Sequence, residues 1–296
     1  MNPVISGFFY LIFKVKLKTF SRKIFIKVIG QSLNLLSIVQ PKKAALIAYQ
    51  LFSRPRKGKF NSNKLPKTLQ SCQIEQFLSD GETFHAYIWK GNADIIMLVH
   101  GWESNPARWK KMLPFLKKTG KTIVAIDAPA HGMSSGNEFN VPKYTRFLEV
   151  CTQKYNPTIL IGHSIGGATC IHYQHLNQNP LIKKMVLLGA PSDLQTLIDH
   201  YCTMMGYQNV LKKYLQNHFL TKIKTSIDDF SMAKLSQNIN TSTLIIHDED
   251  DAIVHVNEAY KIVKGHPKAT FIKTKNLGHG LHDEDLYQKM EAFILN

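Results

Sequence analysis

Five short, continuous apolar runs, separated by stretches long enough for helices, constrain the fold of this 296-residue chain more than any other feature. They are IIMLV (95–99), TIVAI (122–126), TILIG (158–162), MVLLG (185–189) and TLIIH (243–247). Strands that are buried on both faces have this pattern. Helix-length stretches lie around residues 106–118, 142–154 and 165–177, and TFHAYIW (83–89) alternates like a half-exposed strand. The sequence therefore predicts an α/β fold, with a mostly parallel central sheet and helices on both faces.

Polar or glycine-rich residues follow each of these runs. In a mostly parallel sheet the carboxyl ends of the strands share one edge, and functional groups collect just beyond it. The segments are HGW (100–102), DAPAHGMS (127–134), HSIGG (163–167), APSD (190–193), DEDD (248–251) and, after a short last strand around residues 270–274, GHG (278–280). The candidate catalytic residues are therefore expected in these segments.

One of these segments has the pattern G-x-S-x-G, from Gly162 to Gly166. A serine on a tight strand-to-helix turn needs small neighbours two residues away on either side, because the turn crowds against adjacent strands. The same turn exposes the hydroxyl at the amino end of a helix. A strand-like run precedes Ser164 and a helix-like stretch follows it, so we interpret Ser164 as a nucleophile.

A serine hydroxyl is a weak nucleophile, so it needs a base, and the base needs an acid to orient it. His279 is the candidate base, because it lies between two glycines after the last strand. Asp251 follows the penultimate strand and is the candidate acid. Asp248 and Asp250 belong to the same acidic run and are alternatives to it.

Two backbone N–H groups are candidates to stabilise the oxyanion of a tetrahedral intermediate. One belongs to Ile165, which follows the nucleophile directly, and the other to Trp102. Gly101 allows the backbone to turn sharply before Trp102. We expect the adjacent His100 to brace the loop and to have no part in catalysis.

In these segments the sequence resembles the α/β-hydrolase superfamily, and within it a group of bacterial esterases with a short amino-terminal extension. The matching segments are VHGW (99–102), AIDAPAHGMSSG (125–136), GHSIGG (162–167), LLGAPSD (187–193), IIHDEDD (245–251) and NLGHG (276–280). Their order, with nucleophile, acid and base in succession, is that of the superfamily. The resemblance implies the α/β-hydrolase fold with a helical cap inserted at about 191–241. It also implies catalytic roles for Ser164, Asp251 and His279, oxyanion donors at Trp102 and Ile165, and neither a metal nor a cofactor.

Two departures from the family pattern leave the choice of acid open. Asp248 stands where many relatives have glycine, and Ala252 and His255 replace the usual prolines. Asp127 and His131 match a structural loop of the family, so we expect them to brace it. A serine at position 164 excludes the related dehalogenases, which need a carboxylate nucleophile.

The formal net charge of +16 is concentrated at the amino-terminal end. Residues 1–74 contain 14 lysines and arginines and no acid, whereas the remaining 222 residues have a net charge of +2. This excludes a uniformly basic nucleic-acid binder, and we expect no nucleic-acid partner. Residues 1–30 mix aromatic and aliphatic side chains with lysine and arginine, the composition of segments that lie on an anionic membrane. We expect this segment to pack on the body as an extra helix or to fray, with peripheral contact with an anionic membrane as the alternative.

We expect a basic, apolar extension and linker over residues 1–70, with an amphipathic helix at 41–53, and a hydrolase domain over 71–296. The apolar run at 4–13 is too short to cross a bilayer, for which about 20 residues are needed, and it has no signal-peptide cleavage site. Scattered cysteines without a CxxC pair favour a reducing compartment. We therefore expect a cytoplasmic protein, with membrane association as an option.

These features together predict a carboxylesterase-like serine hydrolase that cleaves a small-molecule ester, or else a thioester or an amide, through an acyl-enzyme. The alternative, from a different class, is a catalytically silent hydrolase fold that serves as a binding or membrane-recruitment module. The sequence identifies neither the acyl chain nor the oligomeric state.

Overall fold

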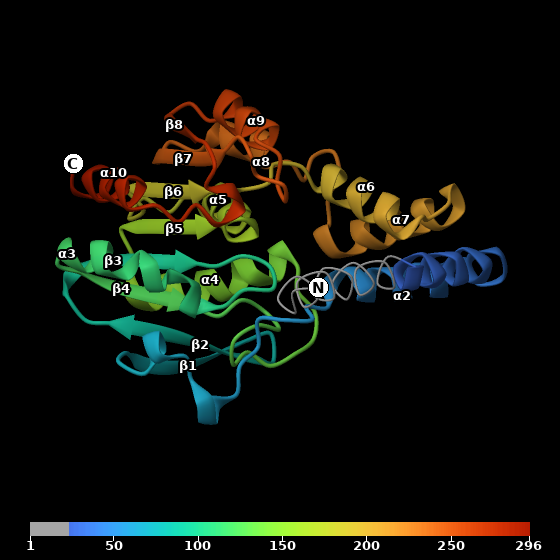
Figure 1. The fold of residues 1–296 in the computed structure, drawn as a ribbon, viewed down its shortest axis with the longest axis horizontal. Helices are drawn as coiled ribbons and strands as arrows, with labels where there is room; N and C mark the ends of the chain where they lie inside the picture. The colour runs from blue at the N-terminus through green and yellow to red at the C-terminus, as the bar shows by residue number, and fades with distance from the viewer. Residues whose placement is uncertain (1–23) are drawn as a thin grey trace, which may run out of the picture. The chain divides into compact units, whose positions relative to one another are not determined.

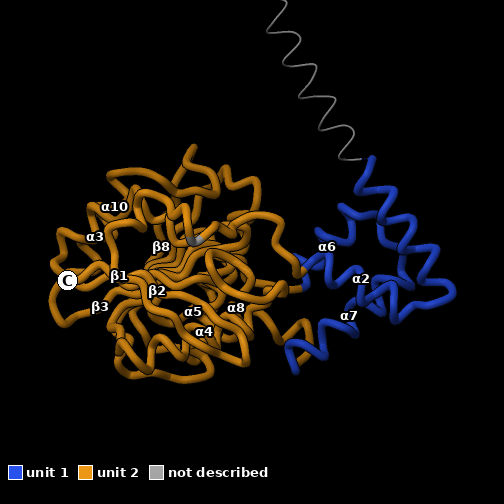
Figure 2. The backbone as a smooth tube through the Cα atoms, turned by 90° about the horizontal axis from the view of Figure 1, so that it is seen from below, with its two compact units in different colours: residues 1–52, 195–224 blue, residues 53–194, 225–296 orange. Residues whose placement is uncertain are grey.

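The structure, a computed structural model, describes residues 24–296, which fall into two compact units. Of the described residues, 24–52 and 195–224 form one unit, called the helical unit below, and 53–194 and 225–296 form the other, the sheet unit. Figure 2 colours the helical unit blue and the sheet unit orange. The helical unit thus combines part of the expected extension with part of the expected cap.

The sheet unit is built on eight strands in the order β1-β2-β4-β3-β5-β6-β7-β8 (Figure 1). They are β1 (Gln73–Ser79), β2 (Glu82–Trp89), β3 (Asn92–Val99), β4 (Lys121–Ile126), β5 (Ile159–His163), β6 (Lys184–Leu188), β7 (Ser242–Asp248) and β8 (Ala269–Thr274). The pairs β1–β2 and β2–β4 are antiparallel, and the pairs from β4 to β8 are parallel. This confirms the predicted α/β-hydrolase fold with a mostly parallel sheet.

The five apolar runs form β3, β4, β5, β6 and β7, and their side chains are almost all buried. Helices on both faces of the sheet account for this burial. In Figure 2, α3 (Leu113–Lys118) and α10 (Glu284–Leu295) lie on one side of the sheet, and α4 (Val141–Tyr155) and α5 (Ile165–Asn177) lie on the other. Two further helices, α8 (Met232–Leu235) and α9 (Asn257–Gly265), pack on each other.

The helix expected at 106–118 is interrupted. The structure has a 3₁₀ helix, Pro106–Lys111, followed by α3. Pro114 is the second residue of α3, and proline has no N–H to donate to the preceding turn, so a continuous α-helix through this point is disfavoured.

Residues 59–69 lie within the expected linker and pack on the sheet unit. Lys59 forms a bridge with Gly132, the ring of Phe60 lies 6.2 Å from that of Tyr87, and the side chain of Leu69 is fully buried. Leu69 therefore belongs to the core of the sheet unit, and Phe60 packs against it.

The helical unit contains four helical segments: residues 24–39, α2 (Pro41–Ser53), α6 (Leu194–Met205) and α7 (Asn209–Ile223). Only the last residue of α2 and the first residue of α6 belong to the sheet unit. The observed α2 coincides with the helix expected at 41–53. Aromatic contacts hold α2 on α6 and α7, since the ring of Phe52 lies 5.1 Å from that of Tyr201 in α6 and 5.1 Å from that of Phe219 in α7.

Most of residues 1–30, the segment for which membrane contact is the alternative to packing on the body, lies outside the described residues. From residue 24 onward, no helix is both long enough and apolar enough to cross a bilayer.

Candidate active site

Ser164 lies on the turn between β5 and α5, with φ 54° and ψ −126°. Few residues other than glycine adopt such a conformation, so it persists only where the surroundings enforce it. The surroundings are tight: a Cβ on Gly166 would lie 2.1 Å from the carbonyl oxygen of Val99, and one on Gly162 would lie 2.6 Å from the carbonyl oxygen of Gly166. The glycines of the G-x-S-x-G pattern are therefore required by the crowding expected for such a turn.

The backbone around Ser164 is well placed to bind a negative charge. Ile165 is the first residue of α5, so its N–H has no acceptor within the helix and lies at the positive end of the helix dipole. The loop that carries Trp102 passes close to the serine, because a Cβ on Gly101 would lie 2.8 Å from the Cβ of Ser164. The structure thus brings both segments with expected oxyanion donors to the nucleophile turn.

Asp251 and His279 are in direct contact. Nδ1 of His279 lies 2.7 Å from Oδ2 of Asp251, whose other oxygen accepts hydrogen bonds from the N–H groups of Ile253 and Val254. Burial alone would raise the pKa of Asp251, but contacts with His247 and His279 and the N–H of Val254 outweigh it and lower this pKa. Asp251 is therefore an oriented and ionised carboxylate beside the histidine ring.

The carboxylate of Asp248 bonds to the backbone and to a threonine of the segment that leads to His279. It accepts hydrogen bonds from Oγ1 of Thr274 at 2.7 Å and from the N–H groups of Leu277 and Gly278, both at 3.0 Å. Burial would raise the pKa of Asp248, and these hydrogen bonds outweigh it, so its pKa is lowered. Asp248 thus anchors the loop that carries His279, a role that the sequence analysis missed when it considered this residue only as an alternative acid.

Asp250, the other alternative acid, also bonds to the backbone of the histidine loop. Its carboxylate accepts a hydrogen bond from the N–H of Asn276 at 3.1 Å. Of these three aspartates, Asp251 contacts the ring of His279.

Two further side chains hold the histidine loop, and sequence reasoning assigned a role to neither. Nε2 of His163 donates a hydrogen bond to the carbonyl oxygen of His279 at 2.7 Å. Since His163 directly precedes Ser164, this bond ties the nucleophile turn to the loop. Nη2 of Arg108 donates to the carbonyl oxygen of Gly280 at 3.3 Å. His163 could have been noticed from its place in the G-x-S-x-G pattern, whereas no motif marks Arg108.

The histidines expected to brace the neighbouring loops do so. His100 donates from Nδ1 to the carbonyl oxygen of Gly101 and accepts at Nε2 from the N–H of Ala128. His131 accepts at Nε2 from the N–H of Glu103. Burial lowers the pKa of His131 to about 4 and that of His100 well below its usual value, so both rings are neutral near pH 7.

Asp127 is fully buried and accepts hydrogen bonds from the hydroxyl of Tyr87 and the N–H of Met133. Burial raises its pKa well above the usual value. Gly132 packs directly against it, since a Cβ there would lie 1.7 Å from Oδ1 of Asp127. This confirms the bracing role expected for Asp127.

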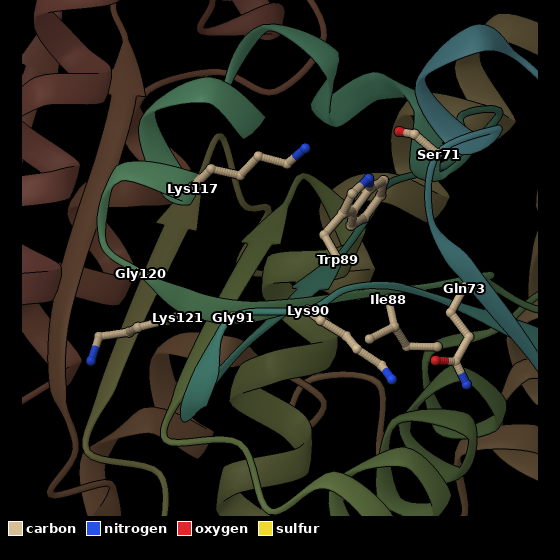
Figure 3. A pocket seen from close by; sticks show the side chains of 9 residues that line it. All are labelled: Ser71, Gln73, Ile88, Trp89, Lys90, Gly91, Lys117, Gly120 and Lys121. Atoms are coloured by element: carbon tan, nitrogen blue, oxygen red, sulfur yellow. The ribbon is translucent and has the colours of Figure 1, made fainter.

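An open cavity of about 530 Å³ lies at the opposite end of the strands, next to the first residues of β3 and β4 (Figure 3). Its lining includes Trp89, Lys117 and Lys121 and none of the residues expected in the active site. The side chains of the two lysines point apart in Figure 3, and Lys121 pairs with Asp94 at 2.7 Å. These lysines do not converge on a common point, so this cavity is not the candidate site.

A family model described as the alpha/beta hydrolase fold matches residues 94–237. Among curated proteins, the chain is similar to the 2-hydroxy-6-oxo-6-(2'-aminophenyl)hexa-2,4-dienoic acid hydrolase of Metapseudomonas resinovorans, at 20% identity over 68% of this chain and 83% of the relative. It is also similar to the monoglyceride lipase of Rattus norvegicus, at 26% identity over 60% of this chain and 59% of the relative.

Among solved structures, the chain is similar to a serine hydrolase from the polyaromatic hydrocarbon-degrading bacterium Cycloclasticus zankles. The TM-score is 0.56 at 18% identity, over 76% of this chain and 98% of that chain. At this level of identity the similarity concerns the fold.

Proposed function

Since the chain belongs to the α/β-hydrolase superfamily, we propose that it is a serine hydrolase that cleaves a carboxylic ester through an acyl-enzyme. In this proposal Ser164 is the nucleophile, His279 the general base and Asp251 the acid that orients the imidazole. The N–H groups of Trp102 and Ile165 stabilise the oxyanion.

The observation that carries the proposal is the 2.7 Å contact between Nδ1 of His279 and Oδ2 of Asp251. An ionised carboxylate only accepts hydrogen bonds, so Nδ1 of the neutral imidazole carries the proton and Nε2 keeps its lone pair. A lone pair on Nε2 is what a general base needs to take a proton from a serine hydroxyl. The lowered pKa of Asp251 keeps the carboxylate ionised through this step.

The reaction then has two balanced halves. Oγ of Ser164 attacks the acyl carbon while Nε2 of His279 takes its proton, and the oxyanion that forms accepts hydrogen bonds from the two backbone donors. When the intermediate collapses, the bond to the alcohol oxygen breaks and the imidazolium returns its proton to the leaving alcohol. Water repeats the sequence on the acyl-enzyme, releasing the acid and restoring the Ser164 hydroxyl.

An ester is the proposed substrate class because the similarity includes a monoglyceride lipase, whose name denotes an enzyme that acts on an ester. The relative from Metapseudomonas resinovorans is a hydrolase of a dienoic acid, so the superfamily match by itself does not select one bond type. Thioesters and amides therefore belong in the same experiment as competing substrates.

The test is a substrate panel with the purified full-length protein. It contains p-nitrophenyl esters from acetate to palmitate, matched acyl thioesters and matched anilides. We expect measurable kcat/KM for at least one ester, higher than for its thioester and anilide, and loss of turnover in Ser164→Ala. Ser71→Ala, at an exposed position, is the matched control and should retain the activity. Absence of hydrolysis across the panel by folded protein would leave the catalytically silent module as the better account.

A further inference from the structure

The helical unit carries an apolar face made of residues that are exposed in the structure. On helical residues 24–39, the side chains of Ile24, Val28, Leu35 and Val39 are 49%, 56%, 68% and 78% exposed. Spacings of four, seven and four residues place them on one side of the helix, and we call them the apolar stripe. Phe25 and Ile38 flank it and are also exposed. We propose that this stripe docks on the surface of an anionic lipid bilayer, an inference that does not depend on the proposed hydrolase activity.

The opposite side of the same helix explains why the stripe is left exposed. The helix packs through Gly30, Asn34 and Ser37, all of which are buried, together with one buried aliphatic side chain, Leu33. A Cβ on Gly30 would lie 1.8 Å from the carbonyl oxygen of Met205, so the two backbones are in close contact. The helix is thereby fixed with the apolar stripe facing away from its packing partner.

Asn34 fixes the rotation of this helix about its axis. Its Nδ2 donates to the carbonyl oxygen of Gly206 at 2.9 Å, and its Oδ1 accepts from the N–H of Gln208, also at 2.9 Å. Lys27 adds a hydrogen bond from Nζ to the carbonyl oxygen of Thr203 at 3.2 Å. A helix normally turns its apolar side to the core, so an exposed stripe on a helix held this firmly indicates a binding surface.

The charge of the helical unit fits an anionic surface. Its described residues include one acid, Asp199, which is paired with Lys212. They include seven lysines: Lys27, Lys42, Lys43, Lys212, Lys213, Lys222 and Lys224. Each lysine near the surface of an anionic membrane strengthens binding by about fivefold. Aliphatic side chains that enter the boundary between headgroups and acyl chains, with lysines in the headgroup layer, are the usual arrangement of helices that lie on a membrane.

The other occupants of such a face explain only half of these observations. A second copy of the chain would cover the stripe, but it would bring two positively charged helical units together. A nucleic acid would neutralise the lysines, but its phosphates would leave the aliphatic stripe in water. An anionic bilayer accounts for both the apolar and the basic residues.

The first experiment removes the apolar contribution. Co-sedimentation of the full-length protein is measured with vesicles of phosphatidylglycerol in phosphatidylcholine. The triple variant Leu35→Gln, Ile38→Gln, Val39→Gln replaces three exposed residues by glutamine, which is a good helix former, so the variant should fold. We expect it to bind at least about tenfold more weakly than the wild type, because the buried aliphatic area is lost. The matched control, Leu176→Gln, Leu181→Gln, Leu295→Gln, changes three exposed leucines of the sheet unit and should bind as the wild type does.

The second experiment removes charge. Lys42→Gln with Lys43→Gln should weaken binding to the phosphatidylglycerol vesicles by about tenfold or more, and added salt should weaken binding by the wild type. Lys110→Gln with Lys111→Gln, an exposed lysine pair of the sheet unit, is the control and should leave binding unchanged. Vesicles of pure phosphatidylcholine should bind the wild type much more weakly.

Several results would overturn the proposal. These are no binding of the wild type to the anionic vesicles, equal binding by the glutamine triple variant, or equal binding to pure phosphatidylcholine. A dimer that light scattering detects and that this triple variant dissociates, without vesicle binding, would assign the stripe to a second copy. A nucleic-acid complex that forms in place of vesicle binding would likewise reject it. Ser164→Ala should bind vesicles normally, so failure of the catalytic proposal and failure of this one are distinguishable.

Discussion

Nδ1 of His279 lies 2.7 Å from Oδ2 of Asp251, although the two residues follow different strands and are 28 positions apart. An amide at position 251 could not hold the Nδ1–H tautomer as the carboxylate does. We therefore expect Asp251→Asn to lower kcat by about 10⁴-fold with a small change in KM. Steady-state kinetics on the best ester of the panel measures this. Asp250→Asn is the control and should lose less than about tenfold; equal losses in the two variants would reject Asp251 as the acid.

Asp248 and Asp251 both have lowered pKa values, which links stability to pH. A carboxyl whose pKa is lower in the folded state contributes its full stabilisation above the ordinary aspartate value of about 3.9. That contribution is lost as the pH falls through the lowered folded pKa.

The free energy of unfolding should therefore decrease from about pH 5 toward pH 2. Asp248→Asn should be less stable than the wild type at pH 7, and its stability should decrease less over the acid range, because the titrating group is gone. Urea denaturation at a series of pH values measures both effects. An Asp248→Asn curve parallel to that of the wild type would show that Asp248 does not anchor the histidine loop through its charge.

The sequence predicted the central strands well. It did not predict edge strand β1 or the interruption of the helix at 106–118, and both differences have a physical reason. The runs that form β3 to β7 are buried on both faces, so almost every residue in them is apolar and the signal is strong. The edge strand β1 is mostly polar and partly exposed, and it has no such signal. The break between the 3₁₀ helix Pro106–Lys111 and α3 was not predicted. The residues around Pro114 are good helix formers, so the pattern indicated one continuous helix.

Features of the site and of the helical unit that depend on neighbouring residues could be predicted from the sequence, whereas those that depend on distant residues could not. The conformation of Ser164 is imposed by neighbours two residues away, so a motif of five residues predicts it. Which of the three aspartates lies against the ring of His279 depends on the shape of a turn, so the contact with Asp251 appears only in the structure. The pairing of Asn34 with Gly206 spans 172 positions and uses small and polar residues, so no apolar periodicity pointed to it.

Gly101 tests how closely the loop that carries Trp102 passes the nucleophile. The Cβ introduced by Gly101→Ala would lie 2.8 Å from the Cβ of Ser164 and 3.0 Å from the carbonyl oxygen of His163. We expect kcat/KM to fall at least about tenfold while the protein stays folded, because the oxyanion donors shift away from the acyl group. Gly81→Ala, in a turn with open space around it, should change stability and leave the kinetics intact. Unchanged kinetics in Gly101→Ala would contradict the proposed oxyanion site.

Asn34 tests the attachment of helical residues 24–39 to the rest of the helical unit. Asn34→Ala removes two part-buried hydrogen bonds to the turn after α6, at a cost of about 2 kcal/mol. We expect faster amide hydrogen exchange in residues 24–39 than in the wild type. Ser32→Ala, at an exposed position of the same helix, is the control. Equal exchange in Asn34→Ala and the wild type would show that the helix is held by other contacts.

The most direct test of the catalytic account is covalent labelling by a fluorophosphonate, which reacts with an activated serine and requires no knowledge of the substrate. We predict one phosphonate adduct per chain, located on Ser164 by mass spectrometry of the proteolysed protein. Labelling should be absent in Ser164→Ala and retained in Ser71→Ala. A folded wild-type protein that remains unlabelled at Ser164, or a Ser164→Ala variant labelled to the same extent, would contradict the account.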